Sequence, residues 1–249
     1  MDRQTSDGYQ LYYWPHIQGR GEFIRLLLEE AGAEYVDVGR LSEERGGGIE
    51  PIREILQGEQ LSPPHFAPPI LRDGDLVISQ TANICLHLAT RHGLAGDDER
   101  DRLHANQIQL TLQDLLTEAH DTHHPISVGE YYEDQKEAAA RRAAAFRAER
   151  MPKFFGYLER AAAPDEASGS PHMVGDQFTY ADLSVFQLLR GLAYAFPNAF
   201  AELESTIPHL LELADAVASR DRIAAYLASE RRIDFNEQGI FRHYPELDA

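Results

Sequence analysis

Residues 9–32 of the chain, YQLYYWPHIQGRGEFIRLLLEEAG, carry a strand pattern followed directly by a helix pattern. The segment Tyr9–Trp14 is short and aromatic and is stopped by Pro15, which predicts a β-strand. From Gly21 onward, apolar residues recur every three or four positions until Gly32, a plausible C-cap, which predicts an α-helix. The chain is therefore expected to begin with an α/β unit.

The strand and helix patterns continue to about residue 93. They predict the order strand, helix, strand, short helix, hairpin, helix. After the first helix, the expected segments are a strand at Glu34–Val38, a short helix at Ile49–Gln57, a hairpin of Pro69–Leu71 and Leu76–Ile78 around Asp73-Gly74, and a helix from Ser79-Gln80-Thr81 to near Gly93.

Strand patterns fade beyond the charged stretch Gly96–Asp101, which we take as the domain boundary. Amphipathic periodicity predicts helices within residues 108–119, 133–162, 183–193, 210–217 and 223–227. Pro152 is expected to kink or divide the second of these. The tail 231–249 holds several aromatic residues and is expected to pack on the body. The predicted domains are residues 1–93, mixed α and β, and residues 94–249, all helical.

Composition narrows the range of partners. The chain has 249 residues, of which 43% are apolar, so it can form a packed core. Its net charge of −18 disfavours nucleic acid and anionic lipid as partners. The only cysteine, Cys85, lies in an apolar run and is expected to be a core thiol. The polar N-terminus and the lack of long apolar runs predict a soluble cytoplasmic protein without a membrane span.

Four short motifs occur in order along the first 90 residues: Tyr12-Tyr13-Trp14-Pro15, Gly19-Arg20-Gly21-Glu22, Pro69-Ile70-Leu71 and Gln80-Thr81-Ala82. Together with the helical remainder, they resemble the glutathione transferases, and most closely the alpha, mu, pi and sigma classes. The resemblance implies a thioredoxin-like N-terminal domain, an all-helical C-terminal domain, glutathione as co-substrate and a homodimer.

The resemblance matches Tyr13 to the tyrosine whose hydroxyl hydrogen-bonds the glutathione sulfur. A free thiol, with a pKa of about 8.5, is mostly protonated at neutral pH, whereas the thiolate is the nucleophile. A hydrogen bond to the charged form favours that form, so a phenol donor fits this chemistry. The neighbouring Tyr12 is expected on the opposite face of the strand.

Further residues follow from the same resemblance. Arg20 matches an arginine near the ligand, and Pro69 matches a cis-proline. In relatives, the residue before that proline gives both N–H and C=O to glutathione. Here it is Pro68, which has no N–H. A second departure is Ala67, where many relatives carry glutamine. Gln80 and Thr81 match the pair that grips the γ-glutamyl end, over a helix N-terminus suited to a carboxylate.

Three more positions complete the expected site. Asp114, in Gln113-Asp114-Leu115, matches an aspartate that reaches across the dimer to the ligand ammonium group. Trp14 and His120 are expected to border the second-substrate pocket. Thr179-Tyr180-Ala181-Asp182 resembles the family's capping box, which supports the fold and carries no chemistry.

A cluster at His120, His123 and His124 raises the alternative of a metal site, because His120 and His124 are one helical turn apart. No further ligand is identifiable and Pro125 follows at once, so we expect no metal. The leading hypothesis is an enzyme in which Tyr13 stabilises glutathione thiolate for attack on an electrophilic or peroxidic substrate. The alternatives are a glutathione-dependent isomerase or reductase and a non-catalytic binding protein on the same fold.

Overall fold

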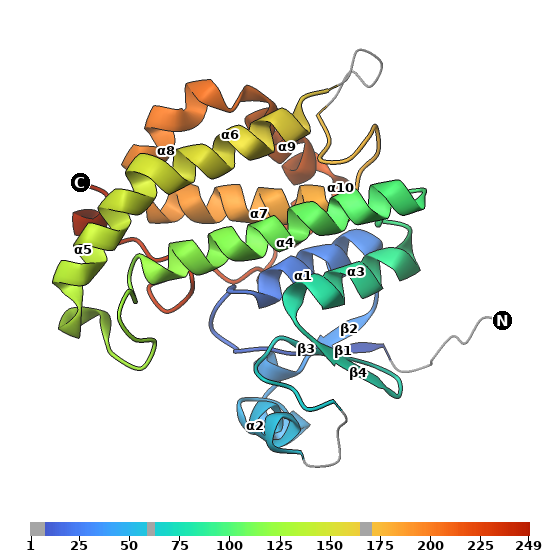
Figure 1. Cartoon of the computed structure of the whole chain (residues 1–249). Helices are drawn as coiled ribbons and strands as arrows, with labels where there is room; N and C mark the ends of the chain where they lie inside the picture. Colours follow the sequence, from blue (N-terminus) through green and yellow to red (C-terminus); the bar gives the residue numbers. More distant parts are fainter. Residues whose placement is uncertain (1–7, 59–62, 165–170) are drawn as a thin grey trace.

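The computed structural model describes residues 8–58, 63–164 and 171–249. Figure 1 shows a small sheet with α1 and α3 on one side and α2 on the other, and a group of longer helices packed beyond α1 and α3. The first part contains β1 Tyr9–Tyr12, α1 Gly21–Ala31, β2 Tyr35–Asp37, α2 Glu50–Gln57, β3 Ile70–Asp73, β4 Leu76–Ser79 and α3 Thr81–His92. The predicted order of elements is confirmed.

The described sheet has the strand order β2-β1-β3-β4. β1 pairs parallel to β2 and antiparallel to β3, and β3 and β4 form the predicted hairpin. β1 ends at Tyr12, so Tyr13 is the first residue after the strand, although the aromatic run predicted a strand to Trp14.

Two apolar clusters cover the two faces of the sheet. Leu11 and Tyr13 belong to the large core formed with α1, α3 and the helical part. Tyr12 belongs to a smaller cluster with Ile52 and Ile55 of α2. The predicted separation of Tyr12 and Tyr13 onto opposite faces is thus confirmed.

The second part contains α4 Glu99–Asp121, α5 Lys136–Ala145, α6 Met151–Ala162, α7 Tyr180–Ala195, α8 Pro197–Leu203, α9 Pro208–Ser219 and α10 Asp221–Leu227. Short 3₁₀ turns lie at Val38–Arg40, Glu43–Arg45, Tyr132–Asp134, Glu204–Thr206 and Pro245–Leu247. α7 is almost wholly buried and packs against α1, α4, α8 and α9. The fold class, a thioredoxin-like α+β part followed by an all-α part, is confirmed.

The long Ala- and Arg-rich helix is divided, as Pro152 predicted. A π-helical segment, Phe146–Arg150, separates α5 from α6, and Pro152 lies in the first turn of α6. Because proline has no N–H, it cannot continue the backbone ladder from the preceding turn, which agrees with the irregular helix at this point. α8 was not predicted, because its short sequence has too few apolar positions to show a period; it begins at Pro197 and buries Ala199 and Phe200.

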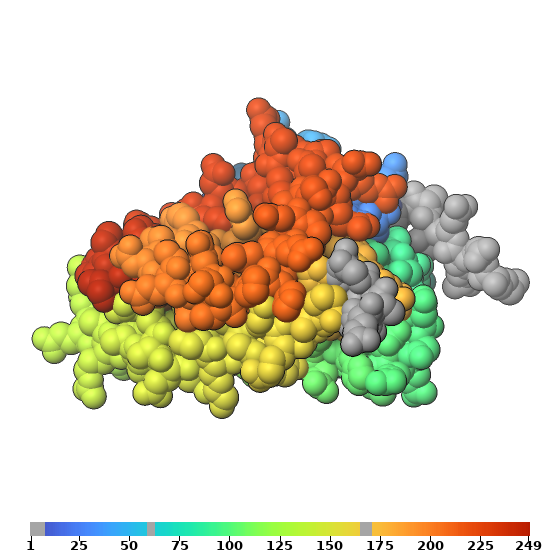
Figure 2. All heavy atoms as spheres, turned by 90° about the horizontal axis from the view of Figure 1, so that it is seen from above, coloured from blue at the N-terminus to red at the C-terminus, as the bar shows by residue number. Residues whose placement is uncertain are grey.

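The C-terminal tail packs back on the body, as its aromatic residues predicted. Phe241 is buried so close to Gly191 of α7 that a β-carbon at that position would clash with its ring. Asp248 accepts hydrogen bonds from the backbone N–H groups of Asn198 and Ala199 at the start of α8. Seen from above (Figure 2), the orange and red residues of α8, α9 and the tail lie along the yellow-green residues of α5 and α6.

Within the described residues, the structure holds no helix that is both long and apolar enough to cross a membrane. Cys85 is fully buried, and burial raises the pKa of its thiol to about 12, which matches the expected core role.

The capping box at the start of α7 gives a test of this core. Asp182 is fully buried and accepts bonds from the backbone N–H groups of Thr179 (2.7 Å) and Met173 (2.9 Å). Asp182→Ala leaves these buried donors unpaired, so we expect the free energy of unfolding to fall by about 3 kcal/mol in urea titrations. The exposed Asp176→Ala should change it by less than about 0.5 kcal/mol. Equal effects would contradict this role for Asp182.

Candidate functional site

Four chain segments meet at one end of the sheet. β1, β2 and β4 all end there and β3 begins there, because Tyr12 pairs with Ile70 and Ile70 pairs with Ser79. The residues just outside these strands therefore lie at the same edge. Tyr13, Pro69 and Gln80, far apart in the sequence, are brought together in this way.

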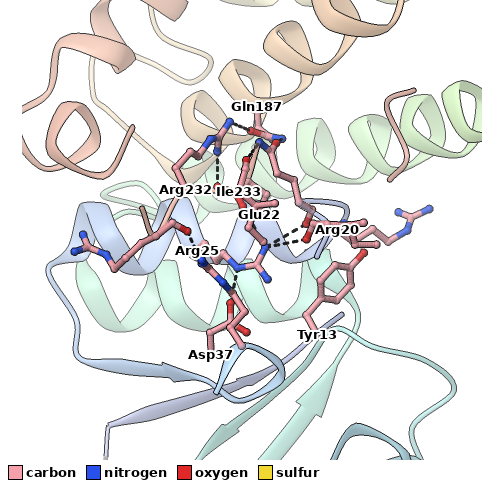
Figure 3. Close-up of polar contacts among 12 residues, drawn as sticks. Tyr13, Arg20, Glu22, Arg25, Asp37, Gln187, Arg232 and Ile233 are labelled. Carbon is pink, nitrogen blue, oxygen red and sulfur yellow. Dashed lines mark hydrogen bonds and ion pairs between the residues drawn. The ribbon is translucent and has the colours of Figure 1, made fainter. Parts of the chain in front are cut away.

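Tyr13 lies at the centre of this edge, directly below the N-terminus of α1 (Figure 3). Its hydroxyl accepts a hydrogen bond from the backbone N–H of Arg20 at 2.8 Å. The ring packs so closely against Gly19 and Gly21 that a β-carbon at either position would clash with it. The glycines of the Gly-Arg-Gly motif thus allow the helix start to close over the ring.

The Tyr13 side chain is 4% exposed, and this burial raises the pKa of the phenol above its usual value of 10. The hydroxyl therefore stays protonated at neutral pH. Because the Arg20 N–H occupies an acceptor position, the hydroxyl hydrogen remains a donor. This arrangement can stabilise an anion placed near the oxygen.

A buried ion-pair network supports the Tyr13 ring from the α1 side (Figure 3). The guanidinium carbon of Arg25 lies 5.8 Å from the ring centroid. Arg25 is fully buried between two carboxylates, with 2.7 Å to Asp37 and 3.2 Å to Glu22. Its Nη1 also donates to the carbonyls of Ile17 and Gln18, in the loop that leads to Arg20. Arg25 thus connects the ring with the loop that covers it.

The same network continues into the C-terminal part of the chain. The Glu22 carboxylate accepts a hydrogen bond from the Tyr226 hydroxyl at 2.6 Å and forms an ion pair with Arg232. Arg232 donates to Gln187, which donates to Gln18 at 2.7 Å. The loop over Tyr13 is therefore held by the sheet, by α7 and by the start of the tail.

Arg20 extends from the start of α1 toward α4. Its guanidinium donates to Gln113 Oε1 at 2.8 Å and to Thr117 Oγ1 at 3.2 Å. The sequence resemblance had matched the next residue, Asp114, to an aspartate that reaches the ligand across the dimer. Asp114 is exposed on α4.

Three further predicted residues, Pro69, Gln80 and Thr81, lie next to the start of β3 and the end of β4. The Pro68–Pro69 peptide bond is cis, as the resemblance implied. Gln80 has a φ of 74°, a strained value for a residue other than glycine that often marks functional sites. Thr81, at the N-terminus of α3, is 2% exposed, and its Oγ1 has no hydrogen-bond partner among the described residues. A buried, unpaired hydroxyl beside unpaired helix N–H groups suits a polar ligand.

The two residues expected at the second-substrate pocket are both half-buried. Trp14 packs against both apolar clusters at the sheet edge. His120 lies on α4 one turn beyond Thr117, the partner of Arg20. Beside the sheet edge, an open cavity of about 750 Å³ runs from Pro15 and His16 to the segments 39–43 and 48–53.

Sequence analysis missed three residues of this region: Glu22, Arg25 and Gln113. Glu22 and Arg25 stand three positions apart in the first two turns of α1, which are otherwise apolar, and a pair of opposite charges at that spacing on a buried face was the available signal. The partners of Glu22 and Gln113 come from distant helices, so no local pattern could have named them.

The end of α4 is tied to the tail by a buried histidine. His123 is 1% exposed, and its Nε2 donates to the carbonyl of Ile240 at 2.8 Å. Burial lowers the pKa of this imidazole to about 3, so it is neutral in the folded protein at neutral pH.

The comparisons with known proteins concern the sequence and the fold. Residues 120–230 match the family model described as glutathione S-transferase, C-terminal domain. A glutathione S-transferase of Plasmodium falciparum is 26% identical over 197 residues, covering 78% of this chain and 84% of the relative. Glutathione S-transferase P 1 of Xenopus laevis is 25% identical over 226 residues, covering 90% and 94%.

Among solved structures, prostaglandin synthase D of Nilaparvata lugens has a TM-score of 0.69 at 18% identity, covering 91% of this chain and 100% of that one. At that identity the likeness shows the fold alone.

The neutral His123 predicts how stability depends on pH. The unfolded histidine takes up a proton near its ordinary pKa of 6.5, whereas the folded one resists it. Below that pH the unfolded state binds more protons, so the free energy of unfolding should fall with acidification, by up to about 1.4 kcal/mol per pH unit. Urea titrations from pH 7.5 to 5 should show a shallower fall in His123→Gln. The exposed His104→Gln on the same helix should follow the parent. Parallel curves for all three proteins would contradict the assignment.

Proposed function

Because the chain belongs to the glutathione transferase superfamily, we propose that it is a glutathione transferase in which the Tyr13 hydroxyl activates the co-substrate. The observation that carries the proposal is the hydrogen bond from Arg20 N–H to the Tyr13 oxygen, which leaves the phenol proton available for donation to a ligand. A thiolate that accepts this proton in a hydrogen bond is stabilised relative to the thiol. Each unit by which the thiol pKa falls requires about 1.4 kcal/mol of such preference.

We propose that glutathione lies along the sheet edge that Tyr13, Pro69 and Thr81 share. Its γ-glutamyl carboxylate would meet the unpaired Thr81 hydroxyl and the first N–H groups of α3, where the helix dipole favours negative charge. The Pro68 carbonyl would accept from the cysteinyl N–H. The cavity from Pro15 to Arg53 leaves room for the remainder of the peptide.

The proposed reaction joins the activated sulfur to an electrophilic or peroxidic apolar substrate. The second substrate would bind between Trp14 at the sheet edge and His120, one turn beyond the Thr117 that Arg20 contacts. Catalysis would come from thiolate formation and from holding the two reactants together. No metal takes part in this scheme. We further propose a cytoplasmic location, which suits a chain whose only cysteine is buried and reduced.

One observation favours a second candidate, a non-catalytic binding protein on the same fold. Pro68 cannot donate the backbone N–H that a related site would offer to the cysteinyl carbonyl. A ligand held by one bond fewer at this point binds more weakly, by about 1 kcal/mol. Under this alternative, glutathione would not be converted to the thiolate.

The two candidates differ in the pKa of bound glutathione. Glutathione is titrated into the protein, and thiolate absorbance in the ultraviolet is followed across pH. We expect the thiol pKa to fall by at least about one unit on binding and to return toward its free value in Tyr13→Phe. Tyr12→Phe is the matched control, because the Tyr12 hydroxyl lies on the opposite face and bonds Gln10. Absence of saturable glutathione binding would refute the transferase proposal. Binding with the same lowered pKa in Tyr13→Phe would assign the activation to another group.

We also propose a homodimer formed through the outer side of α4. Leu103 and Leu110 are 62% and 52% exposed and stand seven residues apart, so they project from the same side of the helix. Asp114 follows Leu110 by four residues and lies on that side as well. If a partner subunit covers these leucines, Asp114 of one subunit would lie against the sheet edge of the other, as the resemblance implies. This supports a site completed by two subunits.

The dimer is tested by replacing both leucines. Light scattering of the unaltered protein should give twice the chain mass of 28.0 kDa. Leu103→Glu with Leu110→Glu should give the single-chain mass, because four buried charges would then face one another. Val128→Glu, also at an exposed apolar residue but beyond the end of α4, should stay dimeric. A parent protein of single-chain mass would exclude this proposal and leave the Tyr13 proposal untouched.

A further inference from the structure

Three histidine rings gather where α4 ends. The ring centroids of His120, His123 and His124 lie 4.8 to 5.2 Å apart. One nitrogen from each ring lies within 4.8 Å of the nitrogens of the other two. His123 is buried, whereas His120 and His124 are half-buried, so the cluster is open to solvent on one side.

The chain turn after α4 creates this arrangement. The helix ends at Asp121, and the backbone N–H groups of His123 and His124 both bond the carbonyl of His120. The hydroxyl of Thr122 bonds the carbonyl of Ala119 and closes the turn. His123 and His124 are thereby folded back over His120. The sequence alone suggested only a pair of rings on one helical face.

The hydrogen bonds assign the nitrogens. His123 Nε2 donates to the Ile240 carbonyl, so the Nδ1 of this neutral ring carries a lone pair. That Nδ1 lies 2.5 Å from His124 Nδ1. His120 Nδ1 faces the Asp121 carboxylate at 3.4 Å, which leaves its Nε2 free. Metal-binding histidines commonly have such carbonyl or carboxylate partners on the nitrogen that does not bind the metal.

We propose that His120, His123 and His124 form a binding site for one divalent transition-metal ion, of which Zn²⁺ is the representative. Three neutral imidazoles suit zinc or copper and do not suit magnesium or calcium, which prefer oxygen. Zinc binds imidazole nitrogen at about 2.0–2.1 Å, so two ligands of one ion are at most about 4.2 Å apart. Ring rotations would have to bring the three nitrogens, which lie within 4.8 Å of one another, into that range when the ion binds. Three protein ligands leave the fourth position to water.

Without metal, His124 Nδ1 donates to His123 Nδ1, and the same rings form a hydrogen-bonded chain to the tail. The site is thus largely prepared before the ion arrives.

One nearby charge opposes the ion. Arg242 acts electrostatically on all three histidines, and its guanidinium is held by the carbonyls of Gln238 and Gly239. A fixed positive charge weakens the binding of a cation. Arg242→Gln should therefore bind the metal more tightly than the parent, a direction of change that loss of a ligand cannot produce.

The test uses the full chain, freed of metal with a chelator and then dialysed. Zn²⁺ is titrated by calorimetry, and Cu²⁺ is bound for electron paramagnetic resonance. We expect one ion per chain and hyperfine splitting from several nitrogens. His120→Asn and His124→Asn should each weaken Zn²⁺ binding at least about tenfold, equal to about 1.4 kcal/mol. Arg242→Gln should tighten it severalfold.

His104→Gln is the matched control, since His104 is an exposed histidine on the same helix with none of these neighbours. Its Zn²⁺ affinity should equal that of the parent. Circular dichroism confirms that each variant is folded, and the half-buried His120 and His124 make unfolding a small risk. The proposal is overturned if no saturable binding occurs at about 0.1 mM Zn²⁺. It is overturned equally if His120→Asn and His124→Asn bind as the control does.

Discussion

The buried carboxylate of Glu22 is the point on which the arrangement of the two parts depends. It lies on α1 without solvent exposure and receives Arg25 from its own helix, Tyr226 from α10 and Arg232 from the tail. A buried charge is costly unless it is paired on every side. The sheet with its helices and the helical part must therefore meet in one relative position, in which these partners converge.

This constraint reaches the candidate active site through Arg25. The same guanidinium that pairs with Glu22 bonds two carbonyls of the loop between β1 and α1 and lies beside the Tyr13 ring. The hydroxyl of Tyr13 is then fixed under the backbone N–H of Arg20, the residue just before α1. A donor held in this way loses little freedom when an anion arrives, which is how preorganised sites stabilise charge. Glu22 and Arg25 thus act through the loop and the ring to hold the Tyr13 hydroxyl in position.

The tail contacts both the loop between β1 and α1 and the end of α4. Ile233 accepts a bond from Gln18, Asn236 bonds the carbonyl of His16, and Ile240 accepts from His123. The tail therefore contacts the loop over Tyr13 and the histidine cluster at the end of α4 within a few residues of each other. A change at either place acts on the same segment of chain.

The sequence by itself determined the elements and their order. Alternation placed Tyr12 and Tyr13 on opposite faces, Thr179 and Asp182 gave the start of α7, and Pro152 marked the divided helix. These features depend on periods of two or about 3.6 residues and on local backbone rules, which a single stretch of chain contains. The motifs at Tyr13, Pro69 and Thr81 were also readable, although their roles stay predictions.

Only the tertiary structure decided which distant side chains meet. Arg20 contacts Gln113 of α4, Glu22 pairs with Arg232 from 210 residues away, and a turn folds His123 over His120. The short helix α8, which buries Ala199 and Phe200, was likewise set by packing. Such contacts depend on how the helices are placed in space. Successive residues on a helix point about 100° apart, so a shift of one position changes which neighbour a side chain reaches. No local period in the sequence records that placement.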